Sequence, residues 1–166
     1  MNVLLLADTH LGEGQGARLV DKLRGHLETA DAIIHAGDVT DASILTTLEE
    51  FAPVRAVLGN NDRGMVLPER FVVEIEGCEI AAVHDSGPAS GRAARLRRWF
   101  PEADVVVFGH SHIPWHEIDI RRADGHVQHH VNPGSAMQRR AAPQHTAAVL
   151  DVREGAVINV GHIVLP

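Results

Sequence analysis

Seven side chains of the kinds that bind metal ions in proteins are spread along the chain, and most of them follow a run of apolar residues. They are Asp8, His10, Asp38, Asn60, His84, His110 and His112. Carboxylate, imidazole and amide donors suit Mn, Fe, Zn, Ni or Co better than Ca, and the lack of thiolates argues against a purely structural zinc site. Seven ligands are too many for one ion, so the set predicts two divalent ions that share one carboxylate.

Three short motifs within this set each begin with glycine. They are Gly37-Asp38-x-x-Asp41, Gly59-Asn60-x-Asp62 and Gly109-His110-x-His112. Each is expected by chance in fewer than about a tenth of chains of this composition, whereas a triplet such as Asp8-Thr-His10 is expected about once. A second such triplet, Asp124-Gly-His126, is interpreted as a hairpin turn. We expect each glycine to permit a sharp turn that aims the next side chain over a strand end.

The spacing of apolar residues predicts the elements that position these side chains. Short apolar runs predict buried strands over 2–8, 32–36, 54–58 and 105–108. Helical spacing predicts helices over roughly 15–28 and 90–100, and a short helix that Asp41 or Ser43 could cap. The arginines from Arg92 to Arg98 are interpreted as a solvated face of the helix over 90–100.

The order of these elements indicates an α/β fold. Strands that alternate with helices in the first half favour a parallel sheet. Segments 71–75 and 79–83 flank Glu76-Gly-Cys78, which is predicted to form a hairpin turn, and the chain after about 113 is predicted to be a meander of short strands. Ligands of open α/β sheets bind at the carboxyl ends of the strands, so we expect the seven side chains to meet at one rim.

The composition narrows the class of protein. A chain of 166 residues with 45% hydrophobic and 22% charged residues predicts one globular domain of ordinary size. The formal net charge of −7 disfavours nucleic acid as a partner, although bound metal ions would reverse the local field. No apolar run resembles a secretory signal or a membrane span. The single cysteine, Cys78, cannot form an internal disulfide, so a cytoplasmic protein is expected.

The ordered motifs resemble those of the calcineurin-like metallophosphoesterases, over residues 2 to about 160. The resemblance rests on Asp8-x-His10, Gly37-Asp38-x-x-Asp41, Gly59-Asn60-x-Asp62, His84 and Gly109-His110-x-His112. The short spacings and Asn132-Pro-Gly-Ser135 are similar to the compact prokaryotic phosphodiesterase branch. The resemblance implies an α/β fold of two facing, mixed β-sheets flanked by helices, a four-layer sandwich formed by a single domain over 1–166.

The resemblance also implies a role for each matching residue. One metal ion would be held by Asp8, His10, Asp38 and His112. A second ion would be held by Asp38, Asn60, His84 and His110. Asp62 would hold one of the metal-binding residues in position without contacting an ion itself. The implied reaction is hydrolysis of a small phosphorylated substrate, with phosphodiesters and manganese favoured, by attack of a hydroxide that bridges the two ions.

Two positions depart from the family pattern. Many members have histidine directly after the metal-binding asparagine, as a general acid or a phosphate ligand, where this chain has Asn61. Many also have glycine after the histidine that matches His84, where this chain has Asp85. Asn61 cannot act as an acid, so esters with good leaving groups should react fastest. The residues predicted to be catalytic are Asn61 and Asp62, and those predicted to contact the substrate are Asn61 and Arg63.

Other functions stay open at this level. The same fold serves as a non-catalytic protein-interaction scaffold in eukaryotic vesicle coats, where the metal site is incomplete, but this chain keeps every ligand position. A nuclease is expected to carry an extra domain or a basic groove, and this chain has neither. A phosphomonoesterase or nucleotide pyrophosphatase would keep the chemistry and change the substrate. A homo-oligomer is also left open, as is an approach of His129 or His130 to the site.

Overall fold

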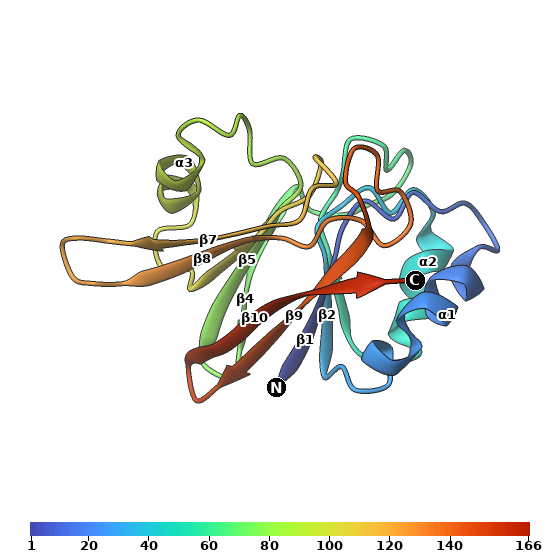
Figure 1. The fold of residues 1–166 in the computed structure, drawn as a ribbon, viewed down its shortest axis with the longest axis horizontal. Coiled ribbons are helices and arrows are strands. Elements are labelled where there is room, and N and C mark those ends of the chain that lie inside the picture. The colour runs from blue at the N-terminus through green and yellow to red at the C-terminus, as the bar shows by residue number, and fades with distance from the viewer.

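The computed structural model describes residues 1–166, and Figure 1 shows its helices and strands. The helices are α1 (Gly16–Leu27), α2 (Ala42–Glu49) and α3 (Arg92–Trp99). The strands are β1 (Asn2–Leu6), β2 (Ala32–His35), β3 (Val54–Ala56), β4 (Arg70–Ile75), β5 (Cys78–Val83), β6 (Val105–Val107), β7 (Trp115–Ile120), β8 (Val127–Asn132), β9 (His145–Arg153) and β10 (Ala156–Leu165). Each strand and helix predicted from apolar spacing is therefore present, with its ends moved by a few residues. No helix combines the length and the apolar character needed to span a membrane.

The strands form two five-stranded sheets. The first sheet has the order β10-β9-β1-β2-β3 and the second the order β4-β5-β6-β8-β7. Parallel pairs join β1, β2 and β3 in the first sheet, and β5, β6 and β8 in the second. The remaining pairs are antiparallel, so both sheets are mixed, as the resemblance implied.

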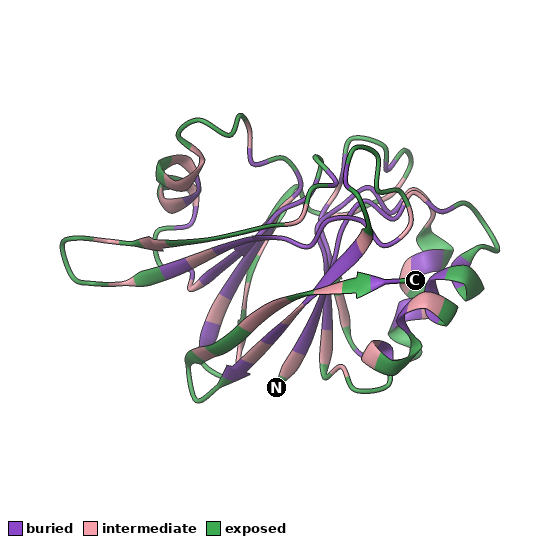
Figure 2. Ribbon diagram, viewed as in Figure 1, coloured by how far each residue is buried: buried purple, intermediate pink, exposed green.

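The alternation of side chains along β1 explains the layers of the fold. Val3 and Leu5 are fully buried between the sheets, in a cluster that also contains residues of β5 and β6. Leu4 and Leu6 point to the other face, where they pack with residues of α1 and α2. A third cluster joins α3 to the second sheet. The order is helices, sheet, sheet, helix, with buried residues concentrated in the strands (Figure 2), which confirms the four-layer sandwich.

The prediction of a meander after residue 113 is wrong. Strand β8 lies inside the second sheet and pairs in parallel with β6, and β9 crosses to the first sheet beside β1. Turns at 122–124 and 154–155 separate β7 from β8 and β9 from β10, but a local turn does not specify which other strand becomes a neighbour in the sheet. The mostly buried side chains of β9 fit its central position in the first sheet, between β10 and β1.

The position predicted for Cys78 is also wrong. The turn consists of Glu76 and Gly77, both with left-handed φ, and Cys78 is the first residue of β5. Its side chain is fully buried between the sheets, and burial raises the pKa of the thiol to about 12. The thiol is therefore a packing group without nucleophilic character.

The structure also tests the predicted cap of α2 and the predicted exposure of the arginines on α3. Asp41 caps α2, since its side chain accepts a hydrogen bond of 2.9 Å from the backbone N–H of Ser43, which confirms one of the two predicted caps. The interpretation of the α3 arginines as a solvated face is wrong for three of them. Arg92 is half-buried, and its guanidinium carbon lies 5.0 Å from the ring centroid of Phe108. Arg95 donates to the carbonyl of Ser86 and Arg97 forms an ion pair with Asp119.

Candidate metal centre

The loops that follow β1, β2, β3, β5 and β6 gather at one end of the two sheets, at the upper edge in Figure 1. Backbone hydrogen bonds of 2.9 Å join Asp8 to Gly37 and Gly109 to His84. The backbone N–H of His110 donates to Oδ1 of Asp8 at 3.1 Å, which links the two sheets. The structure thus brings all seven predicted ligand side chains to one rim, and that they bind metal stays a prediction.

Asp8, His10 and His112 form the first donor group. Nε2 of His10 lies 3.2 Å from Nε2 of His112, with the two rings stacked, and Nε2 of His112 lies 3.6 Å from Oδ1 of Asp8. Nδ1 of His112 contacts the carbonyl of Gln138, and by donating there it leaves Nε2 as the free acceptor. Two imidazole nitrogens that face each other need a shared proton or a cation between them.

Asn60, His84 and His110 form the second donor group. Oδ1 of Asn60 lies 3.0 Å from Nε2 of His84 and 2.9 Å from Nδ1 of His110. The other nitrogen of His84, Nδ1, donates to the carbonyl of Ala36 at 2.7 Å, so Nε2 faces the site. An amide oxygen and two imidazole nitrogens therefore converge on one small space.

Asp38 lies between the two groups. Its Oδ2 is 3.4 Å from Nε2 of His10 and 3.5 Å from Nε2 of His84. Burial works to raise the pKa of Asp38, but hydrogen bonds from His84 and from the side chain and backbone of Asn61 together hold it well below its usual range. Asp38 is consequently an anion at the position that a shared ligand requires.

The protonation states of Asp8, His10 and His112 indicate whether a cation fits between these side chains. Oδ2 of Asp8 is buried without a hydrogen-bond partner, and burial raises the pKa of this carboxyl to about 7 although His84 opposes the shift. Burial lowers the pKa of His10 and of His112, which favours the neutral rings that metal binding needs. A divalent cation would supply the missing partner of Asp8, so the donor set fits divalent metal ions.

The backbone of the site is strained. Five of the seven candidate ligands have φ angles in the left-handed region: Asp8 (54°), His10 (47°), Asp38 (56°), His110 (69°) and His112 (60°). Such a conformation costs a residue other than glycine about 1–2 kcal/mol. It persists only where the surrounding contacts fix it, and such strain concentrates at functional sites.

Asp62 supplies several of those contacts. Its Oδ2 accepts hydrogen bonds from the backbone N–H groups of Asp38 (3.0 Å) and Gly59 (2.7 Å), and its Oδ1 accepts one from Thr40 (2.7 Å). The side chain is buried, so these bonds are shielded from water. Asp62 therefore fixes the loops after β2 and β3 relative to each other, which is the geometry that a ligand-orienting residue requires.

The expectation for the glycines is right for Gly37 and wrong for Gly59 and Gly109, since neither of these two has a left-handed φ. Gly37 has a φ of +87° and makes the turn before Asp38. Gly59 has no left-handed φ, but a Cβ there would lie 2.1 Å from the backbone nitrogen of Asp38 and 2.3 Å from its Oδ1. Gly59 is needed for the close approach of two loops rather than for a turn.

Comparison with known proteins identifies the family of this chain. Residues 1–155 match the model of the calcineurin-like phosphoesterase superfamily domain. This chain belongs to the calcineurin-like phosphoesterase superfamily. A protein of Methanothermobacter thermautotrophicus described as "Probable metallophosphoesterase" is 34% identical over 139 residues, which cover 81% of this chain and 77% of that protein. The family inferred from the motifs is confirmed.

Solved structures of this superfamily fold agree with the architecture. Vps29 from Entamoeba histolytica, in complex with zinc, has a TM-score of 0.69 with 20% identity over 99% of both chains. A structure described as a novel archaeal phosphodiesterase has a TM-score of 0.67 with 21% identity, covering 99% of this chain and 100% of that one. At these identities the likeness shows the fold alone.

Of the other residues predicted to belong to the site, only Asn61 contacts a donor. Asn61 is exposed and contacts Asp38 directly through its side-chain amide. Arg63 is exposed in the same loop, and the structure does not bring it into contact with a donor. His129 and His130 do not approach the site, because their rings pair with His116 and Gln128.

Arg140 lies in a loop beside the donors, and the sequence reasoning did not single it out. It is exposed in the loop after β8, and besides the burial described above its positive charge acts to lower the pKa of Asp8, His10 and His112. The neighbouring contact of Gln138 with His112 places this loop against the donors. The available signal was its short distance in sequence from Asn132-Pro-Gly-Ser135, since a lone loop arginine belongs to no motif.

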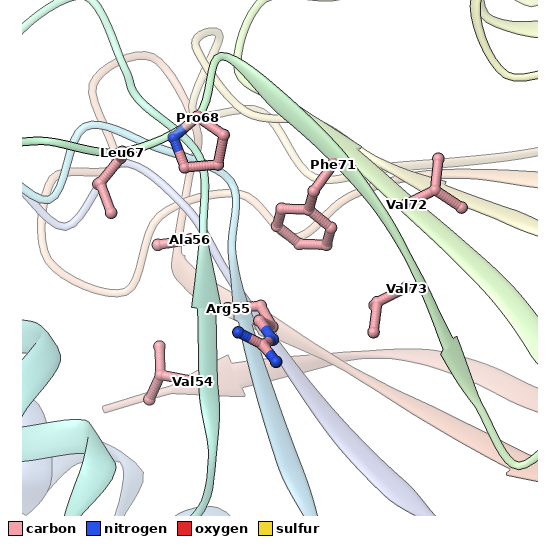
Figure 3. A pocket seen from close by; sticks show the side chains of 8 residues that line it. All are labelled: Val54, Arg55, Ala56, Leu67, Pro68, Phe71, Val72 and Val73. Carbon is pink, nitrogen blue, oxygen red and sulfur yellow. The ribbon is translucent and has the colours of Figure 1, made fainter.

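Two surface cavities lie at different places, one beside the donors and one away from them. A cavity of about 310 Å³ opens at the second donor group and is lined by Leu58, Gly59, Asn60, Glu69, Val83, His84, Asp85 and His110. Figure 3 shows a groove of about 370 Å³ between the edge strands β3 and β4, where Pro68 and Phe71 face Arg55. None of the predicted site residues lines that groove, whereas Asn60, His84 and His110 line the cavity at the second donor group.

Proposed function

We propose that this protein is a two-metal phosphodiesterase that hydrolyses a small phosphorylated substrate. The observation that carries the proposal is the position of Asp38 Oδ2, 3.4 Å from Nε2 of His10 and 3.5 Å from Nε2 of His84. The two nitrogens belong to separate donor groups, so one carboxylate could serve two ions. We keep manganese as the proposed ion among Mn, Ni, Fe, Zn and Co, all of which suit a set of three oxygen and four imidazole donors.

The protein's own residues hold the donors in place. When bound, two divalent ions would supply an activated water and neutralise the charge that develops on the phosphoryl oxygens. Asp62 fixes the backbone of Asp38 and Gly59, and Asn61 fixes the Asp38 carboxylate. Asn61 has no acidic proton, so it positions Asp38 and cannot protonate a leaving group. Esters with good leaving groups should therefore react fastest.

The charges around the cavity favour a diester over a monoester. Glu69 and Asp85 line the cavity beside Asn60 and His84. A diester carries one negative charge near neutral pH and a monoester carries close to two, so the acidic rim repels the monoester more strongly. The same repulsion disfavours a nucleotide pyrophosphatase. The solved archaeal phosphodiesterase of this fold supports the same choice.

Two arginines could contact the phosphoryl group. Arg140 acts electrostatically on Asp8 and His10, so a phosphate bound beside these residues would feel the same positive charge. Arg63 follows Asn61 and Asp62 in an exposed loop and stays a proposed substrate contact. We assign the larger share of phosphate binding to Arg140.

The cellular setting completes the proposal. We infer a cytoplasmic enzyme formed by a single domain, supported by one unpaired, buried cysteine. The acidic net charge of −7 supports a small substrate rather than nucleic acid, and the state of association stays open between a monomer and a homo-oligomer.

The competing proposal is a non-catalytic protein-interaction scaffold, which the fold likeness to Vps29 brings forward. The deciding experiment removes metals with a chelator, restores Mn, Ni, Zn or Mg, and compares bis(p-nitrophenyl) phosphate with p-nitrophenyl phosphate. We expect metal-dependent hydrolysis that favours the diester, loss of activity in Asp38→Ala and retained activity in Asp41→Ala. Hydrolysis of neither ester with any metal would favour the scaffold, and preference for the monoester would overturn the diesterase proposal.

A further inference from the structure

A separate cavity of about 380 Å³ adjoins the loop that carries His110 and His112. It is lined by Ala89, Arg92, Phe108, Ser111, Ile113, Trp115 and Glu117. Ser111 stands between the two histidines in the chain, so the cavity begins where the candidate metal centre ends. None of its lining residues is a metal-ligand candidate, and the proposed chemistry does not use them.

Arg92 in this cavity differs from its neighbours on α3. Arg95 and Arg97 are bonded to a carbonyl and to Asp119, whereas Nε of Arg92 is buried without a hydrogen-bond partner. The guanidinium carbon of Arg92 lies 5.0 Å from the ring centroid of Phe108 and 6.0 Å from that of Trp115. A cation that lines a cavity and is held against two aromatic rings is a recognition group for a planar, polar ligand.

Three other lining groups complete the match to such a ligand. Trp115 is 46% exposed and offers a ring face for stacking. Oγ of Ser111 accepts hydrogen bonds from Asn132 and Ile113, which leaves its own hydrogen free to donate. The carboxylate of Glu117 adds an acceptor, so the cavity offers a stacking face, donors and an acceptor together.

We propose that this cavity binds the nucleobase of a nucleotide phosphodiester whose phosphate is held at the metal centre. The inference rests on the proposed function, because that function places the phosphate beside His110 and His112. The base stacks on Trp115, and its polar edge meets Arg92, Ser111 and Glu117. The cavity volume lies in the range of small-molecule sites. An aliphatic ester group would leave these polar groups unpaired and would bind less well.

The first test measures binding without turnover. The chain has two tryptophans, so a Trp99→Phe background isolates the fluorescence of Trp115. We expect adenosine monophosphate to quench it saturably and ribose 5-phosphate, which has the same phosphate and no base, to leave it unchanged. Arg92→Gln should weaken the nucleotide by about tenfold. Ile118→Ala, on the opposite face of β7 and 54% exposed, serves as the matched control with wild-type binding. Equal responses to the two ligands would overturn the proposal.

The second test separates the cavity from the reaction. Thymidine 5′-(p-nitrophenyl phosphate) and ethyl p-nitrophenyl phosphate share a leaving group and differ in the base. We expect metal-loaded protein to prefer the thymidine ester in kcat/KM, and Trp115→Ala to lower the ratio of the two values by about tenfold, while Ile118→Ala keeps it. A ratio near unity in the wild type overturns the base site and leaves the phosphodiesterase intact. If neither ester is hydrolysed, the proposed function fails and the fluorescence result alone decides on the base site.

Discussion

The side-chain amide of Asn61 donates a hydrogen bond of 2.7 Å to Oδ2 of Asp38, and the backbone N–H of Asn61 donates one of 2.8 Å to Oδ1. One residue therefore holds both oxygens of the carboxylate that lies between the two donor groups. Asn61 is where the chain departs from the family pattern. Its side chain orients Asp38, the candidate shared ligand.

Removal of the Asn61 side chain should loosen metal binding. In Asn61→Ala the Asp38 carboxylate loses a charge-assisted hydrogen bond and one constraint on its orientation. We expect the affinity for Mn, measured by calorimetric titration of chelated protein, to fall by about 10–100-fold. Asn159→Ala on the exposed side of β10 is the control. Wild-type affinity in Asn61→Ala would show that Asn61 does not position the ligand.

Asp62 should contribute stability as well as geometry. Asp62→Ala leaves the N–H groups of Asp38, Gly59 and Thr40 without their acceptor in a largely buried region. We expect the free energy of unfolding, from urea denaturation, to fall by about 3 kcal/mol. Asp41→Ala removes only the cap of α2 and should cost about 1 kcal/mol. Similar losses in the two variants would contradict the central role given to Asp62.

His35 should make stability depend on pH. It is fully buried in β2, with Nε2 3.1 Å from Oγ1 of Thr9, and burial lowers its pKa from 6.5 to about 3. Below pH 6.5 the unfolded chain binds a proton that the folded protein does not. The stability contributed by the neutral ring is therefore present above about pH 6.5 and is lost as the pH falls toward 3.

The variant His35→Gln tests this linkage, because glutamine does not titrate. We expect it to reduce the loss of unfolding free energy between pH 7 and pH 5 by about 2 kcal/mol, measured by urea denaturation of chelated protein. His26→Gln on α1 is the control and should keep the wild-type dependence. Parallel pH curves for His35→Gln and the wild type would refute the assignment.

The strand-end positions of the ligand candidates could be predicted because a short apolar run precedes each of them closely. Asp8 comes two residues after Leu6, and His110 comes three residues after Val107. Parallel strands then bring those ends together whatever the details of the loops. The exact neighbours in the sheet could not be predicted. The parallel pair of β6 with β8 joins segments on either side of β7, and no local signal encodes that choice.

The site itself was predictable in its residue types and not in its backbone. Left-handed φ angles occur at Asp8, Asp38 and His110. Aspartate and histidine adopt them more often than most residues other than glycine, but no sequence pattern indicates at which positions they do so. They depend on contacts between distant loops, such as those of Asp62. Arg140 was missed for the same reason, since only the folded chain brings its loop against His112.

Arg140 and Arg63 can be ranked by steady-state kinetics. Arg140→Gln should raise KM for bis(p-nitrophenyl) phosphate by about tenfold, because it removes the positive charge that acts on Asp8 and His10. Arg63→Gln should raise it less, since the structure does not bring Arg63 into contact with a donor. A larger effect of Arg63→Gln would reverse the assignment of the phosphate contact.

The most direct test of the two-metal account is the number of divalent ions bound per chain. Chelated protein is dialysed against Mn and its metal content measured by elemental analysis beside Asp38→Ala, which removes the carboxylate 3.4 Å from His10 and 3.5 Å from His84. The account predicts about two ions in the wild type and clearly fewer in the variant, since both donor groups lose their shared ligand. One ion or none in the wild type, or the same content in Asp38→Ala, would contradict it.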